Sequence, residues 1–239
     1  EVGNIEAPRV IPMITNQARA TKEDGRWYRI DGFELSYLTA IRAVPLRDLM
    51  STEIELAATN DGLVAPREPL KASRFRLADV PRLKEHRFYQ SAIAAINTQI
   101  VRRIDAAGFM GVVVAPDSGD IDLEAGVDRR PPNKNVARIN ILQARIVQMR
   151  TIAFGRRIPP DTRVNFPAHA AILAKSPVRP YRKGDTGRAY LLRKDLLIDY
   201  LAKLNAVPGQ QVHVAISTAE EPGGMVLDFL VFGDEFEMP

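Results

Sequence analysis

Residues 201–231 read LAKLNAVPGQQVHVAISTAEEPGGMVLDFLV. This stretch is the most informative about the fold, because it places the end of a helix, two strands and the turns between them in a fixed order. Apolar residues over 192–204 recur every three or four positions, which predicts an amphipathic helix, and Pro208-Gly209 ends it. The segments that follow are rich in apolar residues, which alternate with polar ones in the first, and they predict strands over 212–216 and 225–232. This part of the chain therefore predicts a helix followed by a hairpin of two strands.

The rest of the chain contains the same kinds of element in a similar order: strand, helix, helix, strand, strand. Helical periodicity is clearest over 81–107, where isoleucines from Ile93 to Ile104 step by three or four and Gly108 follows the last turn. The other expected elements are a strand over 27–38 with a bulge at Asp31-Gly32, a helix over 45–59, a loop over 63–80, a strand over 112–114, a strand region over 136–154 and a short helix over 167–175.

The repeated order predicts two small α+β units. The strand region over 136–154 is long enough to serve both, so we expect the first unit to end at Ile146 and the second to begin at Val147. Each unit is expected to consist of three strands backed by two helices, because a three-stranded sheet needs such cover to be stable. The chain then divides into an extended lead over 1–26, a first unit over 27–146 with an insertion at about 39–85, and a second unit over 147–239.

The composition limits the possible functions. The length of 239 residues allows one or two domains, and an apolar fraction of 46% with 26% charged residues is that of a globular protein. The formal charge is +4 and the pI is about 9.4, but the arginines are scattered without stacking aromatics between them, so we expect no nucleic-acid binding. The absence of cysteine excludes disulfides, thiol catalysis and cysteine-ligated zinc.

No group of residues has the pattern of an active site. His86, His169 and His213 are far apart in the sequence, and none has the spacing of a metal-binding pair. The sequence contains no nucleophile elbow, phosphate-binding loop or dinucleotide-binding glycine pattern. We therefore expect a protein that is not an enzyme, with no catalytic residue, no metal site and no cofactor.

The stretch quoted first resembles a POTRA domain of two-partner secretion transporters, the family of haemolysin activators and adhesin exporters. The resemblance rests on a helix that ends in Leu-Asn-x-x-Pro-Gly at 204–209, an edge strand, a hairpin with Pro222-Gly223 and a strand containing Leu227-Asp228. Residues 104–116 are similar to the same family's helix, Gly-aromatic pair, strand and proline turn.

The resemblance implies two tandem POTRA-like units, each a three-stranded mixed sheet backed by two helices in the order β-α-α-β-β. It implies a periplasmic module of a Gram-negative outer-membrane transporter, which binds an unfolded secreted protein and passes it to a β-barrel of the same full-length chain. That barrel would begin near or after Pro239 and would attach the module to the outer membrane. The alternative interpretation is a non-catalytic α+β scaffold or protein–protein interaction module of the cell envelope.

POTRA domains of this family are expected to bind by edge-strand addition, in which an extended client pairs with the backbone of an edge strand beside an apolar helix. In this sequence the corresponding strands follow the two amphipathic helices, and arginines nearby would attract an acidic client. The client-binding residues that we expect are Val112, Val113, Val114, Ile100, Arg102, Arg103, Gln211, Val212 and Val214.

Overall fold

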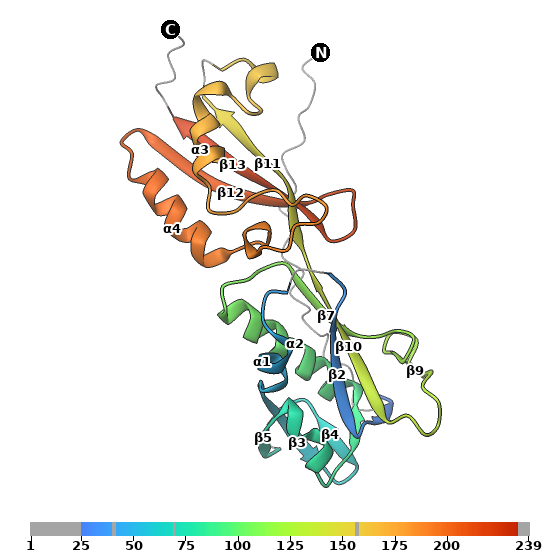
Figure 1. The fold of residues 1–239 in the computed structure, drawn as a ribbon. Helices are drawn as coiled ribbons and strands as arrows, with labels where there is room; N and C mark the ends of the chain where they lie inside the picture. Colours follow the sequence, from blue (N-terminus) through green and yellow to red (C-terminus); the bar gives the residue numbers. More distant parts are fainter. Residues whose placement is uncertain (1–24, 40–41, 69, 156–157, 234–239) are drawn as a thin grey trace, which may run out of the picture. The chain divides into compact units, whose positions relative to one another are not determined.

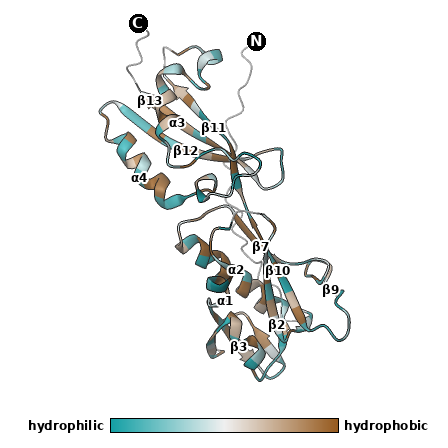
Figure 2. Cartoon of the chain, viewed as in Figure 1, coloured by the Kyte–Doolittle hydropathy of each residue, from teal (hydrophilic) through white to brown (hydrophobic). Residues whose placement is uncertain are grey.

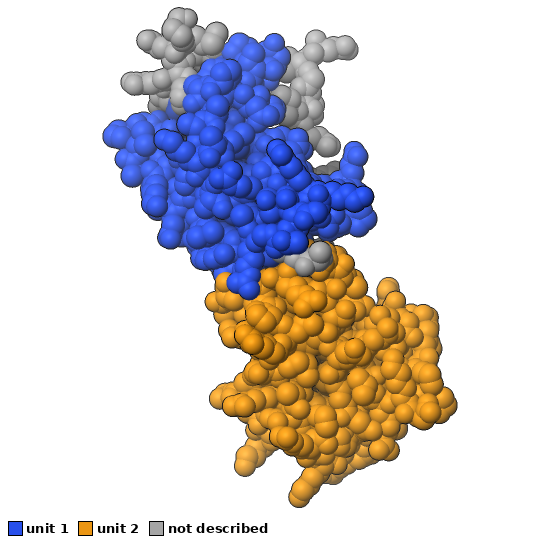
Figure 3. Space-filling view, viewed as in Figure 1, with its two compact units in different colours: residues 1–14, 108–111, 144–239 blue, residues 15–107, 112–143 orange. Residues whose placement is uncertain are grey.

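A computed structural model describes residues 25–39, 42–68, 70–155 and 158–233, so residues 1–24 of the expected lead and residues 234–239 lie outside the described chain. The protein has a mixed α+β fold and divides into two compact units (Figure 3). The N-terminal unit contains the described residues up to Ala107 together with 112–143, and the C-terminal unit contains 108–111 and the described residues from Ala144 onward. None of the helices in the described ranges is long and apolar enough to cross a membrane.

The C-terminal unit has the simpler architecture (Figure 1). Its sheet has the strand order β11-β13-β12, with β13 parallel to β11 and antiparallel to β12. Ile172 of α3 and Leu197 of α4 join Leu227, Phe229 and Val231 in one buried cluster, so both helices cover this sheet. The elements are β11 (Arg145–Phe154), α3 (Ala170–Lys175), α4 (Lys194–Asn205), β12 (Gln210–Thr218) and β13 (Gly224–Gly233), with 3₁₀ turns at Pro160–Thr162, Pro167–His169 and Arg188–Tyr190. This unit therefore has the expected order β-α-α-β-β.

The N-terminal unit contains the same topology. Its three-stranded sheet has the order β2-β10-β7, with β10 parallel to β2 and antiparallel to β7. The elements are β2 (Gly32–Tyr37), α1 (Leu46–Met50), α2 (Gln90–Ala106), β7 (Val112–Pro116) and β10 (Val136–Gln143). Strand β7 thus has the place in this sheet that β12 has in the other unit, and β10 has the place of β13.

A second sheet, with the order β1-β6-β4-β3-β5, belongs to the N-terminal unit alone. Its strands are β1 (Trp27–Arg29), β3 (Glu53–Thr59), β4 (Gly62–Val64), β5 (Ala72–Arg76) and β6 (Arg87–Tyr89); a 3₁₀ segment spans Leu77–Arg82, and the loop from β7 to β10 contains the short strands β8 (Ile121–Asp122) and β9 (Val127–Asp128). Helix α2 contacts both sheets, and its hydrophobic residues are visible in Figure 2. Ile93, Ile96, Ile100 and Ile104 are at most 1% exposed, which confirms the predicted apolar face.

The inserted sheet accounts for two errors of the sequence prediction. The helix expected over 45–59 is wrong beyond Met50, because 53–59 is strand β3, in which Ile54 and Leu56 are buried with the period of two that a strand requires. The loop expected over 63–80 is also wrong, since it contains β4, β5 and the 3₁₀ segment. Strand β4 pairs with β6, about two dozen residues away, and a pairing of that kind leaves no local sequence pattern.

The strand expected over 27–38 is two strands of different sheets. The Ile30 N–H donates to the His86 carbonyl at 2.9 Å, whereas the Asp31 N–H donates to the Asn135 carbonyl at 2.8 Å. The interruption that resembled a bulge is therefore the point where the chain leaves one sheet and enters the other. In the same way Ala144 divides the strand region over 136–154 into β10 and β11.

The long helix of the N-terminal unit is shorter than expected. The periodicity over 81–107 predicted a single helix, but α2 begins only at Gln90. Pro81 lies inside the 3₁₀ segment, and strand β6 separates that segment from α2. Proline lacks the N–H that a helix interior needs, which accounts for the irregular start of this region.

Candidate polypeptide-binding edges

Strand β7 is an edge strand of the N-terminal unit, because within the described ranges it pairs only with β10. At the end of this ladder the Asp117 N–H donates to the Arg138 carbonyl at 2.9 Å. Hydrogen-bonded pairs alternate along an antiparallel ladder, so every second residue counted back from Asp117 directs its backbone toward β10. Val112 and Val114 therefore direct N–H and C=O to the open side, together with the carbonyl of Pro116.

Strand β12 is the corresponding edge strand of the C-terminal unit, where it pairs with β13 as its one strand partner among the described residues. The Ala219 N–H donates to the Gly224 carbonyl at 3.0 Å, so by the same alternation the even-numbered residues of β12 face the open side. One of them is already bonded. The Val212 N–H donates to Asn205 Oδ1 at 2.6 Å, and Asn205 Nδ2–H donates to the Val212 carbonyl at 3.0 Å.

The Leu-Asn-x-x-Pro-Gly motif places Asn205 beside this edge. Helix α4 ends at Asn205, and Gly209 has a φ of +76°, a left-handed conformation that glycine adopts without steric cost, in the turn that leads into β12. Gln210 Nε2–H also donates to the Leu204 carbonyl at 3.0 Å, which satisfies a carbonyl of the last helical turn. The sequence showed the motif, but the bonds between Asn205 and Val212 were not expected.

The structure places the predicted binding residues in different environments. Ile100 is 0% exposed, so it stabilises the core and presents no surface to a client. The side chains of Val114 and Val212 are also buried, which leaves only their backbone groups on the edges. Val113 is 46% exposed, but the alternation directs its backbone toward β10. The remaining predicted residues lie at the surface, with Arg102, Arg103 and Gln211 exposed and Val112 and Val214 half-buried.

Apolar side chains accompany the β12 edge. Helix α4 contacts β12, and Ile198, about two turns before Asn205 on the same side of the helix, is 56% exposed. Val207, between α4 and β12, is 50% exposed. A strand added to this edge could remove part of this apolar surface from water, at about 25 cal/mol for each Å² buried.

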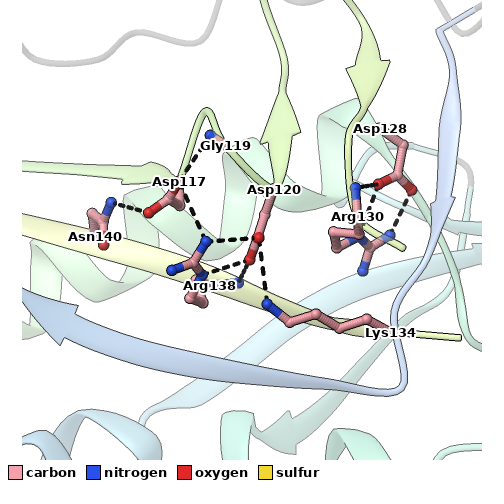
Figure 4. A network of polar contacts seen from close by, with 8 residues as sticks. All are labelled: Asp117, Gly119, Asp120, Asp128, Arg130, Lys134, Arg138 and Asn140. Carbon is pink, nitrogen blue, oxygen red and sulfur yellow. Dashed lines mark hydrogen bonds and ion pairs between the residues drawn. The ribbon is translucent and has the colours of Figure 1, made fainter. Parts of the chain in front are cut away.

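A network of charged side chains fixes the loop that follows β7 (Figure 4). Asp120, whose side chain is 5% exposed, accepts two hydrogen bonds of 2.8 Å from Arg138 and lies 3.4 Å from Lys134 Nζ. The bonds from Arg138 lower the pKa of Asp120 to about 2, against the opposing effect of burial. Asp117 accepts a hydrogen bond of 3.0 Å from Asn140 on β10. Because each carboxylate is paired, the network holds the end of the β7 edge in place.

The three histidines occupy separate environments. His213 is exposed on β12. His169 is 2% exposed beside Phe166, and burial lowers its pKa. His86 Nδ1 lies 3.1 Å from the carbonyl of Ile30. In the ranges that the structure describes, no three His, Asp or Glu side chains form a group that could hold a metal ion.

Comparisons with known proteins returned solved structures alone. No protein-family model matches the chain, and no curated protein matches it. CdiB from Escherichia coli is 13% identical with a TM-score of 0.47, and the match covers 97% of this chain and 31% of CdiB. POTRA1-3 of the periplasmic domain of Omp85 from Anabaena is 10% identical with a TM-score of 0.47, over 87% of this chain and 67% of that structure. This chain spans about a third of the length of CdiB, and the structures to which it is similar include POTRA domains, the class that residues 201–231 resemble.

Proposed function

We propose that this chain is a periplasmic POTRA module of an outer-membrane β-barrel transporter, which binds an unfolded client polypeptide by edge-strand addition and passes it to the barrel. The observation that carries the proposal is the repeated topology. In each unit the strand that follows the long helix, β7 or β12, lies at an edge of a three-stranded sheet and has backbone groups on its open side.

The backbone of these edges suits a client without a fixed sequence. An extended chain can pair its own N–H and C=O groups with Val112 and Val114 of β7, or with Val214 and Ile216 of β12, whatever its side chains are. This mode needs no catalytic group and no cofactor. The function is therefore proposed as binding and transfer, without chemical turnover.

Charge adds a weaker contribution. Arg102 and Arg103 are exposed near the end of α2, the helix that packs beside β7, and neither has an ion-pair partner in the described part of the chain. Exposed arginines would attract an acidic client over roughly the Debye length, about 8 Å at physiological salt. They are expected to speed the encounter more than they strengthen the complex.

The test uses a short synthetic peptide in which valine and threonine alternate, with glutamates at both ends. It is titrated into the whole chain while amide exchange is followed residue by residue. The proposal predicts new protection at the amides of Val112 and Val114 and of Val214 and Ile216, because these groups face the open sides. Protection confined to other surfaces would contradict it, and binding of folded partners without any unfolded peptide would favour the scaffold alternative.

A matched pair of variants separates backbone pairing from side-chain packing. Both variants disturb the buried packing of the Val114 side chain. Val114→Pro also removes the N–H on the open side of β7, whereas Val114→Ala keeps it. Peptide binding to β7 should weaken about fivefold in Val114→Pro relative to Val114→Ala, the factor expected for one hydrogen bond. Proline at Val113 is unsuitable for this test, because that residue directs its backbone toward β10.

A further inference from the structure

The side chain of Asn205 makes the two hydrogen bonds with Val212 that the backbone of an added strand would make. It accepts from the Val212 N–H at 2.6 Å and donates to the Val212 carbonyl at 3.0 Å. A carboxamide carries the same donor and acceptor as a peptide unit, so it can replace one residue of a neighbouring strand. The open side of β12 is therefore closed at Val212, while Val214, Ile216 and Thr218 remain open among the described residues.

The same arrangement occurs independently in the N-terminal unit. Gln99 Oε1 accepts from the Glu55 N–H at 2.7 Å, and Gln99 Nε2–H donates to the Glu55 carbonyl at 3.1 Å. Glu55 lies on β3, and the strand on that side of it, β4, begins its pairing with β3 only at Ala57. Here a carboxamide from α2 completes a ladder that the neighbouring strand leaves unfinished. On β12 the carboxamide occupies a position beside which no strand lies among the described residues.

We infer that Asn205 is a positioning residue that stops strand addition at Val212 and so fixes where a client pairs with β12. The inference rests on the proposed function. An incoming strand gains new hydrogen bonds at Val214, Ile216 and Thr218, but at Val212 it only replaces bonds that Asn205 already makes, and such an exchange brings little net free energy. Asn205 also belongs to the same chain, so its effective concentration at Val212 exceeds that of any dilute client.

In the described part of the chain, no side chain is bonded to the open backbone groups of β7 in the way that Asn205 is bonded to Val212. The two open residues of β7 that carry an N–H, Val112 and Val114, make no backbone bond on that side to another described residue and can pair with a client. The inference therefore makes the two edges unequal. Strand β7 accepts a client along its open residues up to Pro116, whereas β12 accepts one only beyond the end of the α4 turn.

The experiment compares the whole wild-type chain with Asn205→Ala, using the alternating valine–threonine peptide as the probe. In the wild type, the Val212 amide should be protected before the peptide is added and unchanged by it, while Val214 and Ile216 gain protection. In Asn205→Ala, the Val212 amide should exchange fast in the free chain and become protected with the peptide. Affinity for β12 should rise about 25-fold, since the client then gains two hydrogen bonds at Val212, each worth a factor of about five.

A control variant and a register measurement exclude a merely structural effect. Gln210→Ala removes the bond to the Leu204 carbonyl but leaves the Asn205–Val212 bonds, so it should weaken the helix end without extending the ladder. The chain has no cysteine, so Gln211→Cys can carry a single spin label that reports how far the bound peptide reaches. The peptide should approach this label more closely in Asn205→Ala than in the wild type.

The outcomes distinguish the inference from the proposed function. If the peptide protects Val214 and Ile216 equally in both chains and never reaches Val212 in Asn205→Ala, the inference that Asn205 limits strand addition is refuted. The proposal of edge-strand addition is then unaffected. If the peptide approaches the spin label at Gln211→Cys as closely in the wild type as in Asn205→Ala, Asn205 does not exclude a client from Val212, and the inference is also refuted. If the peptide protects neither β7 nor β12 in any chain, the proposed function fails, and the inference fails with it.

Discussion

The long helices of the two units, α2 and α4, have the same place in the same topology but differ in how deeply they are buried. Six residues of α2 are buried, because this helix contacts strands of two sheets, whereas Leu197 alone is buried in α4. The inserted sheet thus converts a surface helix into a core helix. The same topology can therefore contain either a deeply buried helix or a more exposed one, according to what is inserted between its elements.

The strongest test of this comparison is Ile100→Ala in α2. Ile100 is 0% exposed, so its truncation should leave a cavity and lower the free energy of unfolding of the N-terminal unit by about 2–5 kcal/mol. The only tryptophan, Trp27, lies in β1 of this unit, so its fluorescence reports denaturant unfolding there. A loss below about 1 kcal/mol would mean that α2 is not the core helix described above.

The matched change in α4 is Leu201→Ala. Leu201 is half-buried against the cluster of the C-terminal unit, so we expect a smaller loss, about 1–2 kcal/mol. Amide exchange of β13 residues would measure it, because these residues pair on both sides. An effect equal to that of Ile100→Ala would remove the contrast between the helices.

How much of this contrast the sequence could predict differs between the units. The C-terminal unit was predictable because its helix and strands have distinct periods and follow one another closely. In the N-terminal unit, residues 45–59 contain apolar positions compatible with a helix, and only the partners of β3 make the period of two decisive. The edge positions of the strands after each long helix were expected only through the resemblance, not from the order of the elements alone. The bond of Asn205 to Val212 was not, since a motif shows which residue is present and not how far its side chain reaches.

A third prediction concerns acid. In the N-terminal unit the folded pKa of Asp120 is lowered from 3.8 to about 2 by its bonds from Arg138. A carboxyl group with a lowered pKa stabilises the fold above its unfolded pKa, and this contribution is lost as the pH falls from about 4 through about 2. Asp120→Asn should therefore flatten the pH dependence of unfolding in that window, as measured by Trp27 fluorescence.

The control for this prediction lies in the other unit. Asp228 on β13 is bound by Arg150 on β11 through hydrogen bonds of 2.7 and 2.8 Å, a similar bidentate pair. Asp228→Asn should leave the acid response of the N-terminal unit unchanged. If both variants alter it equally, the pH dependence does not come from Asp120.

The smallest expected effect concerns charge beside the β7 edge. Arg102→Gln removes one exposed cation, so binding of the glutamate-ended peptide should weaken by less than about threefold at low salt and hardly at all at high salt. Lys203→Gln on the exposed surface of α4 is the matched change beside β12. A loss that is independent of salt would show that Arg102 makes a specific contact instead of a general attraction.

The proline at the end of β7 has a kinetic consequence. Pro116 has no N–H, and the preceding open residues are only Val112 and Val114, so this edge offers a client few hydrogen bonds. Each such bond contributes about 0.5–1.5 kcal/mol, and a small sum gives a fast dissociation rate. Under the function proposed above, fast dissociation would let the bound polypeptide leave this edge before it folds or aggregates there.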